Sequence, residues 1–396
     1  MSVQHLSDRI NNLSVSQTLA MAAKARELTA LGKDIISLSL GEPDFNTPDF
    51  IKEAAIKAIN ENWSNYPPVD GYLDLRQAIA KKFKRDNNLE YQPANIVVST
   101  GAKQSLYNIA QVMLNDGDEV ILPAPYWVSY SEIIKMSGGI PVVVPTTVES
   151  DFKITPEQLA NAITTKTKMM WFSSPCNPSG SVYSKEELLA LVEVLKNHPN
   201  IYIVSDEIYE HINFSGGYSS IGSLDGMFER TITVNGVAKA FAMTGWRIGY
   251  IGAPEFIAKA CTKLQGQVTS GANSIAQRAT IAAVEANPSE INYMVQAFHK
   301  RRDLVLQLVS DIPGLKVNKP EGAFYLFPDV SFYFGKTLQG VEINNADDLA
   351  MYLLEHANVA TVTGEAFGNP NCLRLSYATS ENILKEAFKR IKEALI

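Results

Sequence analysis

The sequence has little cysteine. Only three cysteines occur in 396 residues, and they are widely spaced, at Cys176, Cys261 and Cys372. An odd number of distant cysteines does not suit a disulfide framework or a thiolate metal site. We therefore expect reduced thiols, as in a cytoplasm, and no metal centre.

The chain also lacks a strong excess of one charge and any long apolar run. Lys and Arg total 35 against 42 Asp and Glu, a net charge of −7, and this balance does not suggest a surface for polyanions. The opening MSVQHLSDRI is polar where a secretory signal needs an apolar stretch, and no apolar run is long enough to cross a bilayer. We expect a soluble cytoplasmic protein without nucleic-acid or membrane partners.

What the chain does have is length and apolar content for two domains. Its residues are 46% apolar and 19% charged, which is typical of globular proteins. Apolar runs such as 169–172 and 201–204 alternate with helical patterns, which predicts an α/β fold with a mostly parallel sheet covered by helices. We expect seven strands, at 95–100, 119–123, 141–145, 168–173, 201–205, 231–235 and 247–252.

The two ends of the chain predict a smaller α+β domain. It combines a helix over 16–33, a strand over 35–40 and later strands near 323–327, 358–363 and 372–377. Between them, Thr47, Pro48 and Asp49 predict a helix start with a capping hydroxyl and proline in the first helical position. We place the large domain at 47–290 and the small domain at 1–46 and 291–396.

Lys239 is the strongest candidate for a reactive group. It follows a predicted strand in a turn of small residues among apolar neighbours, and Arg247 comes eight residues later. Small residues let a bulky group approach, and apolar surroundings lower the pKa of an amine toward its nucleophilic form. A surface lysine on a loop is the alternative, and the commoner one.

Several other residues follow predicted strands, where an open parallel sheet binds its ligands. They are Asn177, Asp206, Tyr209 and Trp127, whereas Arg374 lies inside an apolar strand, a costly place for an unpaired guanidinium. Each has a structural alternative when it is taken singly. Asn177 could be a turn residue, Asp206 a helix cap, Trp127 a core residue, and Arg374 half of a buried ion pair.

The turn at 99–104 joins a predicted strand to a predicted helix. Backbone N–H groups at such a helix start, aided by the helix dipole, can hold a phosphate without a basic side chain. Gly101 lets the backbone approach closely, and Ala102 and Lys103 open the helix. Many turns of this kind bind nothing, which is the alternative here.

Together these segments resemble the class I pyridoxal-phosphate-dependent aminotransferases of fold type I. The stretch 234–250, with its lysine and arginine, resembles the cofactor-lysine signature of that family, and 177–180 resembles its Asn-Pro-x-Gly loop. The resemblance extends from about residue 15 to the C-terminus. It implies that Lys239 binds pyridoxal 5′-phosphate covalently and, once freed, moves a proton from the substrate Cα.

The resemblance also implies how the cofactor ring is held. Asp206 matches the acid that pairs with the pyridine nitrogen, and Tyr209 matches the phenol that hydrogen-bonds O3′. Asn177 matches an amide that donates to O3′ and faces the substrate carboxylate. Trp127 matches the aromatic residue that stacks on the ring, and it also borders the substrate.

For the phosphate, the resemblance implies ligands from two subunits. Arg247 and the turn 101–103 match phosphate ligands within one chain. Tyr66 matches the tyrosine that reaches the phosphate of a neighbouring subunit, which implies a homodimer with shared active sites. The family often has serines one and three residues before the lysine, but Ala238 and Gly236 stand there, so one phosphate ligand is missing.

The substrate residues resemble those of the bacterial and plant aspartate aminotransferases. Arg374 matches the arginine that clamps the α-carboxylate, and Gly41 matches a glycine whose backbone faces the same group. Lys103, Ser16 and Thr18 match the groups that receive the distal carboxylate. The alternative for Ser16 is a helix cap.

The implied activity is transfer of the amino group of L-aspartate to 2-oxoglutarate by a ping-pong mechanism, giving oxaloacetate and L-glutamate. Aminotransferases of aromatic substrates or prephenate and a β-lyase stay open, because they share the cofactor residues. A non-catalytic cofactor-binding regulatory module is the alternative from another class. Such modules carry a fused DNA-binding domain, and the sequence before residue 15 is too short for one.

Overall fold

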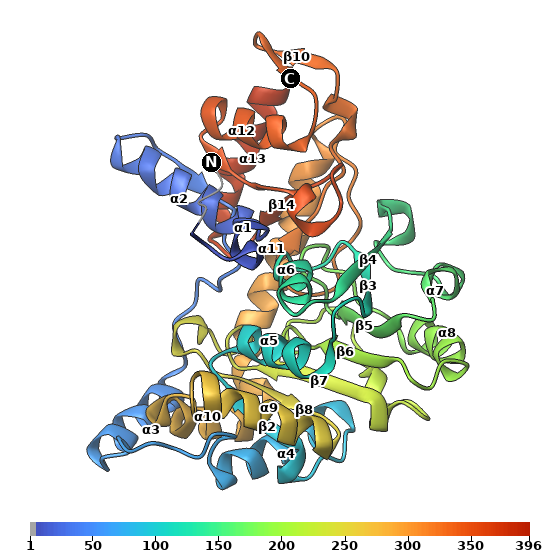
Figure 1. Ribbon diagram of the computed structural model, residues 1–396. Helices are drawn as coiled ribbons and strands as arrows, with labels where there is room; N and C mark the ends of the chain where they lie inside the picture. Colours follow the sequence, from blue (N-terminus) through green and yellow to red (C-terminus); the bar gives the residue numbers. More distant parts are fainter. Residues whose placement is uncertain (1–4) are drawn as a thin grey trace.

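A seven-stranded sheet dominates the computed structural model, which describes residues 5–396 (Figure 1). β8 is antiparallel to both of its neighbours, and all other neighbours pair in parallel. The predicted fold class is therefore confirmed. Across the sheet the strands are β2 (Ile96–Ser99), β8 (Gly249–Gly252), β7 (Thr231–Gly236), β6 (Tyr202–Asp206), β5 (Thr167–Ser173), β3 (Glu119–Ala124) and β4 (Ile140–Pro145).

Helices cover both faces of this sheet because successive side chains of a strand point to opposite faces. Trp171 lies in a core with α5, α6 and α9, whereas Met170 and Phe172 lie in a core with α7 and α8. A third core packs α4 and α10 on Val98 and Tyr250. The bounds are α3 (Asp49–Asn60), α4 (Leu73–Asn87), α5 (Ala102–Met113), α6 (Ser129–Met136), α7 (Pro156–Ala162), α8 (Lys185–Lys196), α9 (Glu255–Val268) and α10 (Ser274–Glu285).

The remaining elements form small sheets with helices around them. Figure 1 shows α11 running from the large sheet toward α12 and α13. A three-stranded antiparallel sheet has the order β13-β14-β9, and β1 pairs in parallel with β12. The bounds are α1 (Asp8–Asn11), α2 (Gln17–Ala30), β1 (Ile36–Ser37), α11 (Asn292–Ser310), β9 (Tyr325–Leu326), α12 (Ala346–His356), β12 (Val359–Ala360), β13 (Val362–Thr363), β14 (Leu373–Ser376) and α13 (Glu381–Leu395).

The structure differs from the sequence-based expectation in three strand regions. The strand expected over 358–363 is two strands, because β12 and β13 join different sheets on either side of Thr361. The strand expected over 35–40 is only two residues long. A hairpin of β10 (Lys336–Leu338) and β11 (Val341–Ile343) was not predicted, although Gln339 and Gly340 adopt the positive φ angles of a two-residue hairpin turn.

Thr47 does not cap α3, contrary to the prediction. The helix begins at Asp49 with Pro48 as its N-cap residue, and no side chain caps it. The hydroxyl of Thr47 instead donates to the carbonyl oxygen of Ala242 at 2.7 Å. This bond ties the segment before α3 to the loop that carries Lys239, so the hydroxyl serves a tertiary contact rather than the helix.

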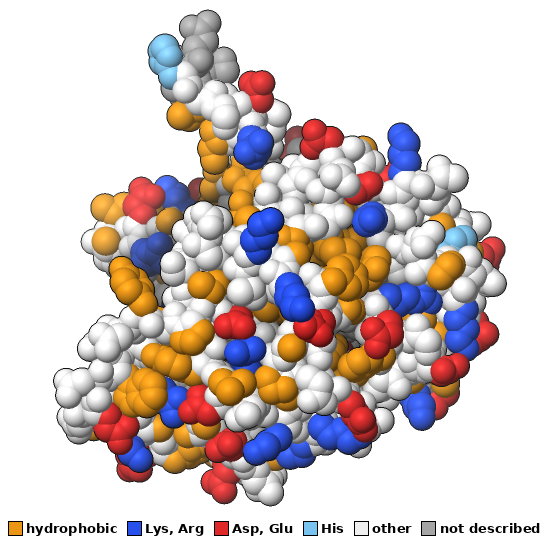
Figure 2. Space-filling model, turned by 60° about the horizontal axis from the view of Figure 1, so that its bottom comes forward, with side chains coloured by type: hydrophobic (Ala, Val, Ile, Leu, Met, Phe, Trp, Pro, Cys, Tyr) orange, Lys and Arg blue, Asp and Glu red, His pale blue; other side chains and the backbone are white. Residues whose placement is uncertain are grey.

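The surface agrees with the mixed charge of the sequence. Basic and acidic side chains are interspersed over the face shown in Figure 2. Within residues 5–396, no helix combines the length and the apolarity that crossing a bilayer requires. The division into domains at residues 47 and 290 stays a prediction.

Candidate functional site

A pocket of about 290 Å³ opens where several strands of the large sheet end. β2, β3, β5, β6 and β7 point their carboxyl ends to this edge, and the antiparallel β8 begins there. Ligands of open α/β sheets bind at this edge. Of the predicted site residues, all but Tyr66 line the pocket: Ser16, Thr18, Gly41, Gly101, Ala102, Lys103, Trp127, Asn177, Asp206, Tyr209, Lys239, Arg247 and Arg374.

Lys239 lies in the turn after β7, and its amine is inside the pocket. Nζ donates to the carbonyl oxygen of Gly41 at 2.5 Å. Burial, helped by the positive charge of Arg374, lowers the pKa of Lys239 to about 8. Near neutral pH a useful fraction of this amine is therefore unprotonated and able to attack a carbonyl carbon.

Asp206 is the buried carboxylate of the pocket. It ends β6, and the hydroxyl of Tyr130 donates to its Oδ2 at 2.6 Å. Burial raises the pKa of Asp206 to about 6, and the bond from Tyr130 opposes that rise. A carboxylate held in this way can keep a heterocyclic nitrogen protonated. Tyr130 was missed in the sequence, although it lies one helical turn beyond Trp127 at the start of α6.

Tyr209 faces the pocket beside a second tyrosine that the sequence analysis missed. The hydroxyls of Tyr209 and Tyr325 are 2.6 Å apart, and both side chains are buried. Burial, with Tyr325 beside it, raises the pKa of Tyr209 well above its usual value, so the phenol stays a proton donor. The signal for Tyr325 was its place in a predicted apolar strand, which by itself indicates only a core residue.

The turn after β2 forms a cradle for an anion. Gly101 has φ +84°, and a Cβ there would overlap Nη2 of Arg247. The structure records no acceptor in residues 5–396 for the backbone amides of Ala102 and Lys103, which open α5. Arg247 is exposed and donates to the carbonyl oxygen of Thr244 at 2.8 Å. A guanidinium and free helix-start amides suit a phosphate.

The structure shows why the residues before Lys239 offer no serine hydroxyl to a phosphate. A Cβ on Gly236 would lie 3.0 Å from both the Cα of Gly249 and the carbonyl oxygen of Ile248. A serine there would have to push β7 and β8 apart. Ala238 lines the pocket but carries no polar group. The phosphate would therefore depend on Arg247 and the amides of the turn.

Arg374 is a buried cation whose recorded partners are all neutral. It lies on β14 with 2% of its surface exposed, and it donates to Oδ1 of Asn177 at 3.1 Å and to the carbonyl oxygen of Ser39 at 2.6 Å. Its Nε is buried and has no partner within residues 5–396. Burying a guanidinium without a carboxylate is costly, so this side chain suits an anionic ligand. Since Asn177 uses Oδ1 here, its Nδ2 is free to donate.

The outer part of the pocket combines an aromatic ring, an amine and two hydroxyls. Nζ of Lys103 lies 4.8 Å from the centre of the Trp127 ring. Burial and the charge of Arg247 lower the pKa of Lys103. Ser16 is the N-cap residue of α2 by position, but its side chain makes no capping bond. Oγ1 of Thr18 is buried and has no partner within residues 5–396.

Tyr66 is the one predicted site residue outside the pocket. It lies in the loop between α3 and α4, and 96% of its surface is exposed. Nothing within residues 5–396 covers this large apolar ring. Its contact with the phosphate of a neighbouring subunit stays a prediction.

The lining of the pocket fits pyridoxal phosphate. The phosphate matches the cradle at Gly101 and Arg247, the pyridine nitrogen matches the buried carboxylate of Asp206, and the aldehyde matches the buried amine of Lys239. Trp127 offers a flat apolar surface for the ring. After this group is placed, Arg374 and Lys103 remain as cations for a further anion.

Comparison with known proteins agrees with this chemistry. A family model described as aminotransferase class I and II matches residues 33–391. An aspartate/prephenate aminotransferase of Cereibacter sphaeroides is 47% identical, and an aspartate aminotransferase of Bacillus subtilis is 48% identical; in both cases 98% of each chain is covered. The solved Thermus thermophilus aspartate aminotransferase with maleate superposes with a TM-score of 0.93 at 42% identity, over 99% of this chain and 100% of that one. This chain belongs to the class I and II aminotransferase family.

Proposed function

We propose that the protein transfers the amino group of L-aspartate to 2-oxoglutarate, giving oxaloacetate and L-glutamate by a ping-pong mechanism. The observation that carries this proposal is the pocket itself. A buried amine of lowered pKa, Lys239, shares it with the buried carboxylate of Asp206 and the buried guanidinium of Arg374. Relatives that match over nearly the whole chain are named aminotransferases, which favours an enzyme over a regulatory module.

The enzymes of this family depend on pyridoxal phosphate, and the residues of this chain divide the work of holding it. The backbone amides at 101–103 and Arg247 bind the phosphate. Asp206 would hold the proton on the ring nitrogen, Tyr209 and Asn177 would hydrogen-bond the phenolic oxygen, and Trp127 would stack on the ring. When bound, the cofactor supplies an electron sink for the electron pair left as Cα loses its proton.

Lys239 moves the proton of the reaction. With the cofactor bound, its amine would accept the proton from Cα of the substrate and would then serve as the acid that gives this proton back. A pKa of about 8 for the unliganded amine is close enough to neutral pH for both steps. Tyr209 and Arg374 stay in place as a donor and a cation beside it.

Arg374 orients the substrate through its α-carboxylate, with the backbone of Gly41 beside it. The planar guanidinium can bind a carboxylate through two parallel hydrogen bonds. Lys103, Ser16 and Thr18 receive the distal carboxylate at the outer part of the pocket. The dicarboxylate maleate in the Thermus thermophilus relative supports a dicarboxylic substrate.

Prephenate is a second candidate amino acceptor. The Cereibacter sphaeroides relative is named an aspartate/prephenate aminotransferase. Prephenate is a dicarboxylate too, so the same pair of cations could receive it. An acceptor assay with prephenate and aspartate as donor separates a bifunctional enzyme from one confined to aspartate and 2-oxoglutarate.

The working unit in this proposal is a homodimer in the cytoplasm. Tyr66 reaches the phosphate in the neighbouring subunit, which accounts for its exposed ring in the single chain. The pocket lies between the proposed large domain, 47–290, and the small domain that carries Arg374. Gel filtration with light scattering tests the dimer.

The experiment that tests the activity is a panel of amino donors with 2-oxoglutarate as acceptor. The purified protein should be yellow, and aspartate should bleach its visible absorbance band until 2-oxoglutarate restores it. A colourless protein, or one whose spectrum no amino acid alters, would overturn the proposal. A Lys103→Ala variant should lose far more activity with aspartate than with phenylalanine; equal losses would contradict the role given to Lys103.

A further inference from the structure

The turn that follows β6 has two faces. Asp206 and Tyr209 line the pocket, whereas Glu207 and Glu210 lie outside it, with 0% and 7% of their surfaces exposed. The turn has no regular secondary structure after Asp206. Backbone bonds hold it in part, such as the one from the amide of Glu207 to the carbonyl oxygen of Val234 at 2.8 Å, and the contacts of the two buried glutamates add to them.

The glutamates meet a buried cation on α4, a helix that contributes no residue to the lining of the pocket. Nζ of Lys82 contacts Oε1 of Glu210 and donates to Oδ1 of Asn87 at 2.8 Å, and only 2% of Lys82 is exposed. Nδ2 of Asn87 in turn donates to Glu207 at 2.9 Å and to Glu210 at 2.6 Å. Lys82 is thus the positive charge that balances Glu210, and the amide of Asn87 links this pair to Glu207, which also accepts from the hydroxyls of Ser205 and Ser220.

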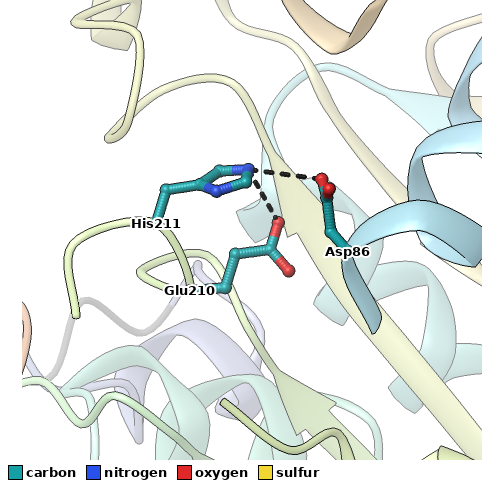
Figure 3. Close-up of side chains that lie close together, drawn as sticks. All are labelled: Asp86, Glu210 and His211. Atoms are coloured by element: carbon teal, nitrogen blue, oxygen red, sulfur yellow. Dashed lines mark ion pairs between the residues drawn. The ribbon is translucent and has the colours of Figure 1, made fainter. Parts of the chain in front are cut away.

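A metal ion is the other reading of this region. Figure 3 shows His211, Glu210 and Asp86 converging, with Nε2 of His211 at 3.3 Å from Glu210 and 3.6 Å from Asp86. Lys82, however, contacts the same Oε1 of Glu210 and lies 3.7 Å from the same Oδ2 of Asp86. An ammonium group already neutralises these oxygens and would repel a divalent cation. Because Lys82 already neutralises these carboxylates, the cluster does not suit a metal ion.

We propose that Lys82 is a positioning residue for the pocket, acting through Glu210 and Asn87 on the turn that carries Asp206 and Tyr209. The inference rests on the proposed function, because its effect is read on the bound cofactor. Without Lys82, Glu210 would keep only the amide of Asn87 and the imidazole of His211 beside it in a buried space, and a buried carboxylate without a balancing cation is costly. The turn would shift to relieve this, and Asp206 and Tyr209 would move with it.

The test compares Lys82→Met with Arg230→Met. Arg230 is also a buried cation, but it donates to the carbonyl oxygens of Leu195 and His198, away from the turn. Two quantities are measured: the dissociation constant of pyridoxal phosphate from the apoprotein, and the pH midpoint of the visible absorbance of the holoenzyme. Lys82→Met should weaken cofactor binding about tenfold and shift the midpoint by about half a pH unit or more, whereas Arg230→Met should lower only the free energy of unfolding.

Two further variants keep the inference open to refutation if Lys82→Met folds poorly. Glu210→Gln should shift the midpoint as Lys82→Met does. The double variant Lys82→Met/Glu210→Met removes both charges, and it should return the midpoint toward that of the unsubstituted protein because replacing a whole buried pair is often tolerated.

The outcomes separate this inference from the proposed function. If the unsubstituted protein binds the cofactor and transaminates aspartate, but the Lys82 and Glu210 variants behave like Arg230→Met in both measurements, the positioning role is wrong and the function stands. If the unsubstituted protein shows no cofactor band, both fail together.

Discussion

At the scale of single residues, Tyr130 helps to keep Asp206 charged through one hydrogen bond. That bond, 2.6 Å long, opposes the rise in the pKa of Asp206 that burial causes. A protonated Asp206 could not hold a positively charged ring nitrogen. The residue that the sequence did not indicate, Tyr130, thus supports the proposed role of the carboxylate that it did indicate.

Replacing Tyr130 with phenylalanine tests this control. A hydrogen bond to a charged group is worth about 1.5–3 kcal/mol, so we expect kcat to fall about tenfold or more at pH 6.5. The loss should be smaller at pH 8.5, because the pKa of about 6 for Asp206 would rise in the variant and matter most near that value. Tyr202→Phe, which changes a ring packed against Phe256, is the control. A loss independent of pH would contradict the mechanism.

Arg374 differs from a lysine at the same place in shape rather than in charge. Arg374→Lys keeps the cation but loses the planar pair of donors. We expect the KM for aspartate to rise about tenfold to a hundredfold, while the affinity for pyridoxal phosphate is unchanged. Steady-state kinetics and a cofactor titration measure the two effects. The assignment fails if cofactor binding weakens and the KM does not move.

At the scale of elements, the turn between β2 and α5 depends on a backbone that only glycine adopts easily. Gly101 and Gly117 have similar φ angles, +84° and +87°, but only Gly101 faces a neighbour, Arg247, whereas the space around Gly117 is open. The two glycines therefore separate backbone strain from the loss of the anion cradle.

Gly101→Ala should weaken the binding of pyridoxal phosphate about tenfold or more, since Arg247 must move to admit the new Cβ. Gly117→Ala should cost about 1–2 kcal/mol of unfolding free energy from its φ angle, with no change in cofactor affinity. Fluorescence titration of each variant with pyridoxal phosphate measures the cofactor affinity. Equal effects of the two substitutions would show that the turn at Gly101 does not hold the phosphate.

The turn after β6 makes the stability of the apoprotein depend on pH. Burial raises the pKa of Glu207 to about 7 from 4.5. Above pH 4.5 the unfolded chain releases this proton while the folded chain keeps it, so folding stability falls as pH rises to about 7. The loss amounts to about 3 kcal/mol at most.

Glu207→Gln removes this titration. Urea unfolding of the apoprotein at pH 5 and pH 7.5 should show a smaller loss of stability in the variant than in the unsubstituted protein. Glu186→Gln, which changes an exposed carboxylate at the start of α8, should leave the difference unchanged. Identical pH dependence in Glu207→Gln and the unsubstituted protein would rule out a buried, protonated Glu207.

At the scale of the whole molecule, the pocket of one chain is incomplete if Tyr66 acts in its neighbour. A mixture of Lys239→Ala and Tyr66→Ala subunits distinguishes a site shared between subunits from a site built within one subunit. In a hybrid dimer with shared sites, one site carries both substitutions and the other carries neither. Random mixing in equal amounts would leave about a quarter of the sites intact.

We expect the mixture, after dissociation and reassociation, to recover about this fraction of the original activity at a limiting concentration of pyridoxal phosphate. If Tyr66 acts within its own subunit, no hybrid has an intact site, and the activity of the mixture equals the mean of its two parents. Mixing without dissociation is the control.

The sequence by itself determined the α/β sheet and most of the pocket. The sheet follows from local patterns, because apolar runs such as 169–172 predict buried strands and the residues just after them, including Asp206 and Lys239, are expected at one edge of a parallel sheet. The roles of the pocket residues came from the resemblance of their segments to a known family. Arg374 was indicated as a site residue because an unpaired guanidinium inside an apolar strand is costly. These predictions require no knowledge of which distant residues touch.

Only the tertiary structure decided the contacts between segments far apart in the chain. Tyr130 bonds to Asp206 across 76 residues of sequence, and Tyr325 to Tyr209 across 116. Thr47 donates to Ala242 instead of capping α3. Lys82 sits in an ordinary helical pattern, and nothing local indicates that its ammonium group is buried against Glu210. The physical reason is that the charge of a buried group depends on what surrounds it in space, and those neighbours come from other elements of the fold.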